Sequence, residues 1–298
     1  MDSAVSARKV SLRPYEAEPV RVQAPPTQRI PFVFASPHSG AFYHPSFLAA
    51  SRLDPVTLRR SEDSFIDEVF AAAPTLGAPL LLALFPRAYL DPNREPYELD
   101  AQMFAEPLPP FVKTRSERVR AGFGTIARMV STGAEIYRER LRFAEAEARV
   151  RTLYEPYHNT LDALVEATRS KFGAAIVIDC HSMPSIGGPS DKDAGRQRTD
   201  IVLGDRYGTS CAPALTDTAE RTLKGLGFRV ARNDPYAGAH TLIRHGRPDE
   251  GVHALQIEIN RALYLDEAKI AKLAGFADLV RRITSFLEAM SWFDASDL

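Results

Sequence analysis

The chain has 298 residues, with 37 Lys and Arg against 38 Asp and Glu, so its formal net charge is −1. This balance excludes a global electrostatic attraction to nucleic acid or to an anionic membrane surface. The length suits one α/β domain with insertions, and the two cysteines, Cys180 and Cys211, are too few for a disulfide framework.

The first thirty residues are polar and contain several prolines. They predict a flexible leader over 1–30, followed by a single folded domain over 31–298. The N-terminus has no apolar signal region, and no later segment approaches the roughly 20 apolar residues of a membrane span. We therefore expect a cytoplasmic protein without a membrane or nucleic-acid partner.

Short apolar runs that end in turn or polar residues predict buried strands. These runs lie within residues 31–40, 77–91, 173–182, 199–205, 227–234 and 253–264.

Two amphipathic segments lie between these runs. Residues 61–73 open with a serine and early acidic residues, as is typical of a helix N-terminus. Residues 136–172 predict a long helix that is broken or kinked at Pro156. Alternating strands and helices favour an α/β fold with a mostly parallel or mixed central sheet and helices on both faces. Such sheets bind ligands at the carboxyl ends of their strands.

Two histidines stand where apolar strands end: His38 after the first run and His181 after the third. A lone histidine is more often structural than a ligand, but parallel topology brings strand ends into one crevice. Imidazole nitrogen suits zinc, and a catalytic zinc commonly takes three protein ligands. We expect the third ligand to be a carboxylate. Glu62 and Asp63 are the nearest candidates, although both could simply favour a helix N-terminus.

Glu258 alternates with Leu255, Ile257 and Ile259, so one face of this predicted strand carries Gln256, Glu258 and Asn260. A carboxylate on a strand built for burial costs several kcal/mol unless a partner compensates it. This favours a functional role for Glu258. The alternative is an edge strand whose polar face lies in water.

Eight short motifs occur in order from Ser36 to Glu267. They are SPHSG, SEDSF, DPNR, YEPYH, IDCHSMPS, IVLGDRYGTSC, TLIRHGRP and VHALQIEINRALYLDE. In this order they resemble the N-formylglutamate amidohydrolase family, and the resemblance implies a phosphorylase/hydrolase-like core similar to zinc carboxypeptidases and aspartoacylases.

The resemblance implies a role for each matched residue. It implies that zinc is held by His38, Asp63 and His181, with Asp63 preferred to Glu62. Glu258 would be the general base for a water activated by zinc, attacking the amide of a small acidic N-acyl amino acid, with N-formyl-L-glutamate as the first candidate. The oxyanion donor would be Arg94 or His158.

Arginines suit the recognition of substrate carboxylates. Arg94 lies near a strand end and Arg244 in a predicted loop, so either could bind an acidic substrate. The segment 122–137 matches the family poorly and is expected to shape the pocket, which leaves the amino-acid specificity open. The alternatives are a zinc peptidase or N-acetylmuramoyl-type amidase on the same scaffold, or a metal-binding protein without catalysis.

Overall fold

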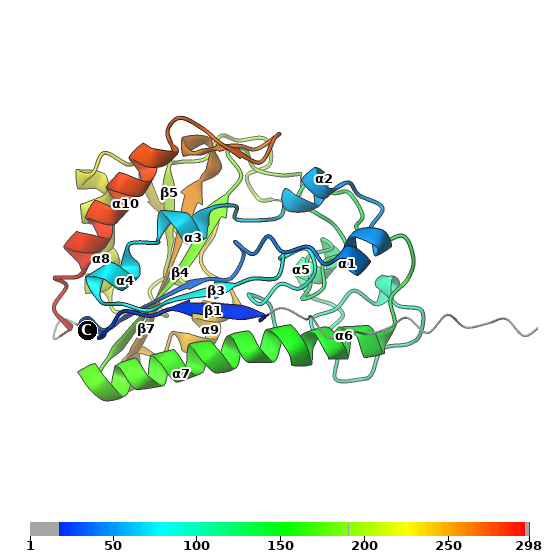
Figure 1. Cartoon of the computed structure of the whole chain (residues 1–298), viewed down its shortest axis with the longest axis horizontal. Helices are drawn as coiled ribbons and strands as arrows, with labels where there is room; N and C mark the ends of the chain where they lie inside the picture. The colour runs from blue at the N-terminus through cyan, green and yellow to red at the C-terminus, as the bar shows by residue number, and fades with distance from the viewer. Residues whose placement is uncertain (1–17, 190, 296–297) are drawn as a thin grey trace, which may run out of the picture.

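The computed structural model describes residues 18–189, 191–295 and 298. A seven-stranded mixed sheet carries helices on both faces (Figure 1), which confirms the predicted α/β fold. Within the described residues, no helix has the length and apolar character needed to cross a membrane.

The strand order of the sheet is β1-β3-β2-β4-β7-β5-β6. The four central strands β3, β2, β4 and β7 are parallel to one another, while β1 and β5 run antiparallel to β3 and β7. A two-stranded ribbon, β8–β9, lies outside this sheet. The strands are β1 Val20–Gln23, β2 Phe32–Ser36, β3 Leu80–Ala83, β4 Ala175–Met183, β5 Ile201–Gly204, β6 Val230–Arg232, β7 Val252–Asn260, β8 Leu265–Asp266 and β9 Ala271–Lys272.

Every apolar run predicted as a strand overlaps one strand of the sheet, with β4 and β7 each extending one residue beyond the predicted run. The sequence reading missed β1, which pairs with β3 from Val20 opposite Ala83 to Gln23 opposite Leu80. Because β1 lies inside the segment predicted as a flexible leader, that prediction is wrong for residues 20–23. Residues 1–17 of the predicted leader lie outside the described residues.

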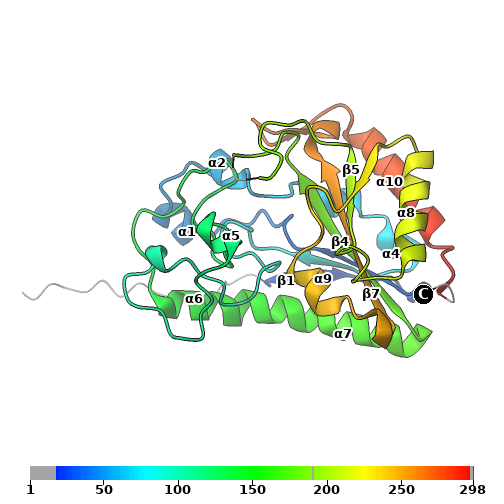
Figure 2. The same cartoon turned by 180° about the vertical axis from the view of Figure 1, so that it is seen from behind.

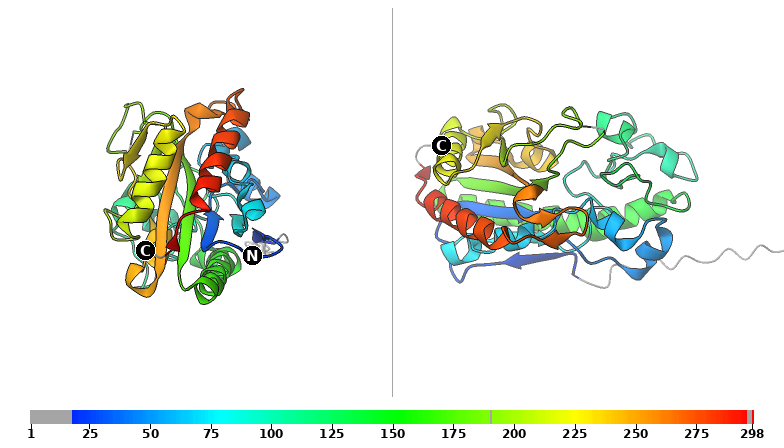
Figure 3. Two further views of the ribbon diagram at one scale, coloured as in Figure 1. Left: turned by 90° about the vertical axis from the view of Figure 1, so that its left-hand side faces the viewer. Right: turned by 90° about the horizontal axis from the view of Figure 1, so that it is seen from above.

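Side chains alternate across each strand, so each face of the sheet has its own core. In β2, Phe32 and Phe34 pack toward α3, α4, α8 and α10, whereas Val33 and Ala35 pack toward α7 and α9. Figures 1 and 2 show α7 running along one side of the molecule, and Figure 3 shows α8 and α10 at the end away from α1 and α5. The α-helices are α1 Pro45–Ala50, α2 Pro55–Arg59, α3 Ile66–Val69, α4 Ala73–Leu76, α5 Glu117–Arg120, α6 Phe143–Arg149, α7 Glu155–Phe172, α8 Pro213–Gly225, α9 His240–His245 and α10 Phe276–Met290.

The predicted long helix begins at Phe143 instead of Ile136, and the break or kink predicted at Pro156 does not interrupt it. A π-helical segment, Val150–Tyr154, joins α6 to α7. Pro156 stands in the first turn of α7. A proline lacks the N–H that an interior helical position needs, and the wider π turn accommodates this loss. The helix therefore continues past the proline as one nearly continuous rod (Figure 1).

The predicted helix over 61–73 begins later than expected. The first helix here, α3, starts at Ile66, and the residue before it, Phe65, has φ of 67°. Glu62 and Asp63 therefore lie in a turn between α2 and α3, not in the first turn of a helix. The alternative to a role as metal ligand, that these acids stabilise a helix N-terminus, therefore applies to neither of them.

Candidate metal centre

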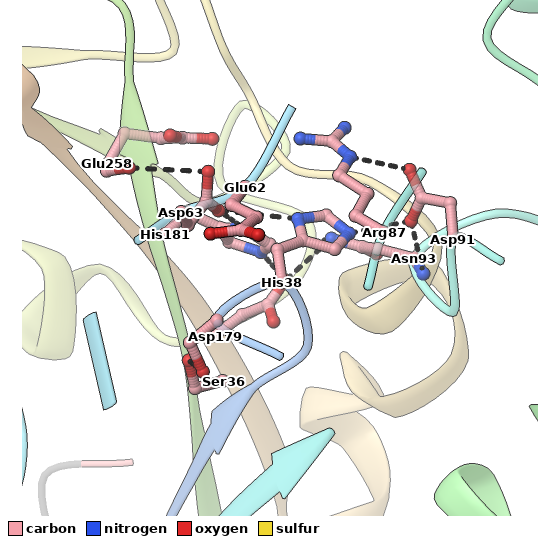
Figure 4. A network of polar contacts seen from close by, with 12 residues as sticks. Ser36, His38, Glu62, Asp63, Arg87, Asp91, Asn93, Asp179, His181 and Glu258 are labelled. Carbon is pink, nitrogen blue, oxygen red and sulfur yellow. Dashed lines mark hydrogen bonds and ion pairs between the residues drawn. The ribbon is translucent and has the colours of Figure 1, made fainter. Parts of the chain in front are cut away.

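His38, Asp63 and His181 form a buried group whose potential ligand atoms all lie within 4.8 Å of one another (Figure 4). His181 is on β4, His38 follows β2, and Asp63 reaches both from the turn before α3. The distances from Asp63 Oδ2 are 3.0 Å to His181 Nδ1 and 3.3 Å to His38 Nδ1. Such a set of two imidazoles and one carboxylate could hold a metal ion.

The far nitrogen of each histidine is held by a second carboxylate. His38 Nε2 lies 2.7 Å from Asp91 Oδ1, and His181 Nε2 lies 2.8 Å from Asp179 Oδ2. A carboxylate can only accept, so Nε2 carries a proton in both rings and Nδ1 is the atom that faces Asp63. Metal-binding histidines are commonly oriented in this way, by a carboxylate bonded to the ring nitrogen that does not face the metal.

The electrostatics of the group follow from its burial. Burial alone would raise the pKa of Asp63, but hydrogen bonds to His181 and His38 outweigh it and hold that pKa well below its usual range. Burial would likewise lower the pKa of His181, but the charge of Asp179 outweighs it and raises that pKa. The carboxylate of Asp63 is therefore ionised and positioned to neutralise a cation between the two rings.

Asp63 and Glu62 were both candidates for the third position, and the structure separates them. The Glu62 carboxylate accepts hydrogen bonds from Arg59 Nε and Ser64 Oγ, whereas the Asp63 carboxylate lies beside both histidines. The Asp63 carboxylate is held by Arg261, whose Nη2 lies 3.0 Å from Oδ1. Adjacent residues in this turn thus face different neighbours.

Glu258 lies beside His181, because the two residues are partners in the parallel ladder between β4 and β7. β7 is flanked by β4 and β5, so Glu258 is not on an edge strand and is only 8% exposed. Burial raises the pKa of its carboxyl to about 7. Gln256 donates a hydrogen bond of 2.9 Å to Glu258 Oε1. A carboxyl of this kind can exchange a proton near neutral pH.

The group opens into a cavity of about 390 Å³. Its walls include His38, His181 and Glu258, and the segment 121–131 supplies one side, as predicted for the poorly matching segment 122–137. The basic residues of the wall outnumber the acidic ones, which favours a negatively charged ligand. The basic ones are Arg60, Arg87, Arg94, Arg118, Lys192 and Arg261, and the acidic ones are Asp91, Glu117, Asp191 and Glu258.

Arg94, which was predicted to bind substrate, lines this cavity. Its Nη1 donates to the carbonyl of Asn93 and its Nε to the carbonyl of Phe123. Burial lowers the pKa of Arg94 to about 10, so the guanidinium remains charged at neutral pH.

Two other predicted residues do not reach the cavity. Arg244 belongs to α9 rather than to a loop, and it pairs with Asp162 on α7 at 2.5 Å. His158 is buried against α9, and its Nε2 donates to the carbonyl of Pro92 at 2.8 Å. The structure therefore supports neither a substrate clamp at Arg244 nor an oxyanion donor at His158.

Several site residues were missed by sequence reasoning. Arg87 lines the cavity with its Nε 3.0 Å from Asp91 Oδ2 (Figure 4). The position of Asp179, two residues before His181 on the same strand, was a usable signal because side chains at i and i+2 share a face. No comparable pattern pointed to Arg261. The missed residues are Arg87, Asp91, Asn93, Asp179 and Arg261.

The two cysteines agree with the sequence reading. Cys180 and Cys211 are free and buried. Burial raises the pKa of both thiols, so neither is a ready nucleophile.

Fold and site together define an α/β enzyme with a buried candidate metal centre at the carboxyl edge of its central strands. Residues 30–265 match the family model of N-formylglutamate amidohydrolase, so the chain belongs to that family and is a hydrolase.

Relatives of known name agree with this assignment. The chain is 29% identical over 260 residues to N-formylglutamate deformylase of Pseudomonas aeruginosa, covering 86% of this chain and 90% of the relative. It is 25% identical to N-formylglutamate deformylase of Pseudomonas putida, covering 81% and 84%. The crystal structure of N-formylglutamate amidohydrolase from Ralstonia eutropha JMP134 superimposes with a TM-score of 0.84 at 38% identity, covering 92% of this chain and 98% of that one.

Proposed function

We propose that this chain is a zinc-dependent amidohydrolase that cleaves N-formyl-L-glutamate to L-glutamate and formate. The observation that carries the proposal is the buried His38–Asp63–His181 group beside Glu258 in a cation-lined cavity. The named relatives support the substrate, because two of them are N-formylglutamate deformylases.

The residues present fit a zinc ion. Among the described residues, buried His38 Nδ1 has no partner other than Asp63, whose Oδ2 lies 3.3 Å away, and the two Nε2 atoms are already held by carboxylates. His38, Asp63 and His181 would hold the ion. Bound there, zinc would polarise the scissile carbonyl and lower the pKa of a water molecule to about 7.

Glu258 is the proposed general base. Its pKa of about 7 lets the carboxylate take a proton from the attacking water at neutral pH and later pass it to the nitrogen of the leaving amine. Its place beside His181 keeps this transfer next to the reacting carbonyl.

Arg87 is the proposed donor to the oxyanion. Its Nε is engaged with Asp91, and the free end of the guanidinium points toward the side on which Glu258 lies (Figure 4). Its side chain is 27% exposed and lines the cavity. A preorganised cation at this place stabilises charge that develops on the carbonyl oxygen. This assignment replaces His158, which does not reach the cavity, and leaves Arg94 to bind a substrate carboxylate.

The wall of the cavity supports an acidic substrate. Arg60, Arg118 and Lys192 line it, and among the described residues none of the three has an ion pair with a carboxylate. A dicarboxylate such as N-formylglutamate would supply the missing negative charge. The predicted cytoplasmic location stays a prediction, as does the organisation as a single domain, whose predicted start at residue 31 leaves out β1.

The test is hydrolysis by the zinc-loaded protein of N-formyl-L-glutamate, N-formyl-L-glutamine and N-acetyl-L-glutamate, followed as release of the free amino acid. We expect the highest kcat/KM for N-formyl-L-glutamate, since the glutamine derivative lacks one carboxylate. Loss of activity on treatment with a chelator, restored by zinc, is also expected. Protein that binds no zinc, or that cleaves none of the three compounds, would contradict the proposal.

A further inference from the structure

The turn over residues 92–94 is held by polar groups from two helical segments. His158 Nε2 donates to the carbonyl of Pro92 at 2.8 Å, and Tyr154 Oη donates to the carbonyl of Arg94 at 3.0 Å. Between them, Thr241 of α9 approaches the side chain of Asn93. Tyr154 and His158 stand one helical turn apart, which places both on one helix face. Tyr154 and His158, the first and last residues of the YEPYH motif, therefore hold this turn in place and take no part in the proposed catalytic steps.

The side-chain amide of Asn93 has one defined orientation. The backbone N–H of Thr241 can only donate, and it lies 2.8 Å from Asn93 Oδ1, with Thr241 Oγ1 3.0 Å from the same atom. Oδ1 therefore faces α9, and the Nδ2 donor faces the opposite side. There Nδ2 lies 3.0 Å from Asp179 Oδ2 and 3.1 Å from His181 Nε2. His181 Nε2 donates to Asp179, so the hydrogen bond of Asn93 Nδ2 is the one to Asp179 Oδ2. Asn93 is 2% exposed, so bulk water does not compete for its bonds to Asp179 and Thr241.

Asp179 depends on this amide for its orientation. Its Oδ2 accepts from both Asn93 Nδ2 and His181 Nε2, while its Oδ1 is buried without a hydrogen-bond partner. Without Asn93, His181 would be the remaining side chain bonded to the Asp179 carboxylate among the described residues. The carboxylate could then rotate, and the His181 ring would lose the contact that fixes its plane.

We infer that Asn93 is a positioning residue, which, oriented by Thr241, holds Asp179 against His181 and so aims His181 Nδ1 at the metal. The inference rests on the proposed function, since it needs His181 to be a metal ligand. Partners behind a metal ligand typically change metal affinity or activity by about 10- to 100-fold when mutated.

The first experiment measures the zinc Kd of the full chain by competition with a chromophoric chelator. We expect Asn93→Ala to raise the Kd by about 10- to 100-fold. The matched control is Asn260→Ala, which removes another buried asparagine amide, one that donates to the carbonyls of Arg198 and Thr199 instead of contacting a histidine. Asn260→Ala should lower the Tm of the metal-free protein but leave the zinc Kd near that of wild type.

A second pair of variants covers the case in which Asn93→Ala does not fold. Thr241→Val removes the hydroxyl that helps to orient the amide, whereas Thr241→Ser retains it. We expect a weaker zinc Kd for Thr241→Val, by less than the effect of Asn93→Ala, and a Kd near wild type for Thr241→Ser. Recovery of the affinity in the serine variant would distinguish orientation of the amide from packing of the threonine methyl.

Three outcomes would overturn the inference. An unchanged Kd in Asn93→Ala shows that the amide does not orient the ligand; where that variant is unfolded, an unchanged Kd in Thr241→Val shows that the Thr241 hydroxyl does not act on the ligand through the amide. Equal weakening by Asn93→Ala and Asn260→Ala assigns the effect to general destabilisation. Wild-type protein that binds no zinc removes the proposed function as well, whereas the first two outcomes leave the proposed function intact.

Discussion

Burial of His158 makes the stability of the folded chain depend on pH. Burial lowers the pKa of this histidine to about 3, and the nearby charge of Arg244 acts in the same direction. The ring packs against Tyr154, Tyr157 and His240 and is 2% exposed, so the imidazole is neutral in the folded chain at pH 7. In the unfolded chain the same side chain has an ordinary pKa of about 6.5.

The sign of the effect follows from these two values. Between about pH 6.5 and pH 3 the unfolded chain binds a proton that the folded chain excludes, so the free energy of unfolding falls as the pH falls. Above about pH 6.5 His158 does not lower the free energy of unfolding, and below that pH it lowers this free energy progressively. For a shift of this size, the loss between pH 7 and pH 5 is about 2 kcal/mol.

The perturbation is His158→Gln, which removes the titrating group but keeps a side-chain N–H that can reach the carbonyl of Pro92. Urea denaturation of the metal-free protein at pH 7 and pH 5 measures the free energy of unfolding. Between pH 7 and pH 5, the free energy of unfolding of wild type should fall by about 2 kcal/mol more than that of the variant. His245, whose pKa is lowered to about 4, contributes equally to both proteins and cancels. Equal losses in the two proteins would refute the reasoning.

Three further predictions concern the site and its frame. Glu258→Gln should lower kcat roughly 10²- to 10⁴-fold while zinc content stays unchanged, because Glu258 is outside the proposed ligand set; retained kcat would exclude it as the base. Arg118→Gln should raise KM for N-formyl-L-glutamate, whereas Arg120→Gln, outside the cavity wall, should not; steady-state kinetics on both variants checks this. Gly40→Ala should lower Tm, since its Cβ would lie 2.2 Å from the carbonyl oxygen of Phe85, and an unchanged Tm would argue against that backbone approach.

The sequence by itself determined strands β2 to β7 of the sheet and where three site residues stand. His38, His181 and Glu258 each occur at or near the carboxyl end of an apolar run. Burial on both faces makes such runs apolar, and parallel strands place their carboxyl ends at one edge. Local patterns were therefore sufficient to predict that these side chains meet.

Local patterns could not separate candidates whose immediate sequence surroundings are similar. Glu62 and Asp63 are adjacent acids, and only the path of the turn before α3 directs Asp63 to the histidines and Glu62 to Arg59. The sequence likewise could not choose between Arg94 and Arg244 as substrate-binding residues. Arg94 was predicted near a strand end and Arg244 in a loop, but Arg244 lies in α9 and pairs with Asp162 of α7, whereas Arg94 lines the cavity.

The tertiary structure alone decided the supporting residues. Asn93 and Thr241 are 148 positions apart, and Asn93 and Asp179 are 86 positions apart, so no sequence spacing relates them. The β1 strand was missed for a related reason: only four residues long and partly exposed, it lacks a long apolar run and is stabilised by pairing with β3. Strand burial leaves a pattern in the sequence of the strand itself, whereas a hydrogen bond between distant segments depends on how the whole chain packs.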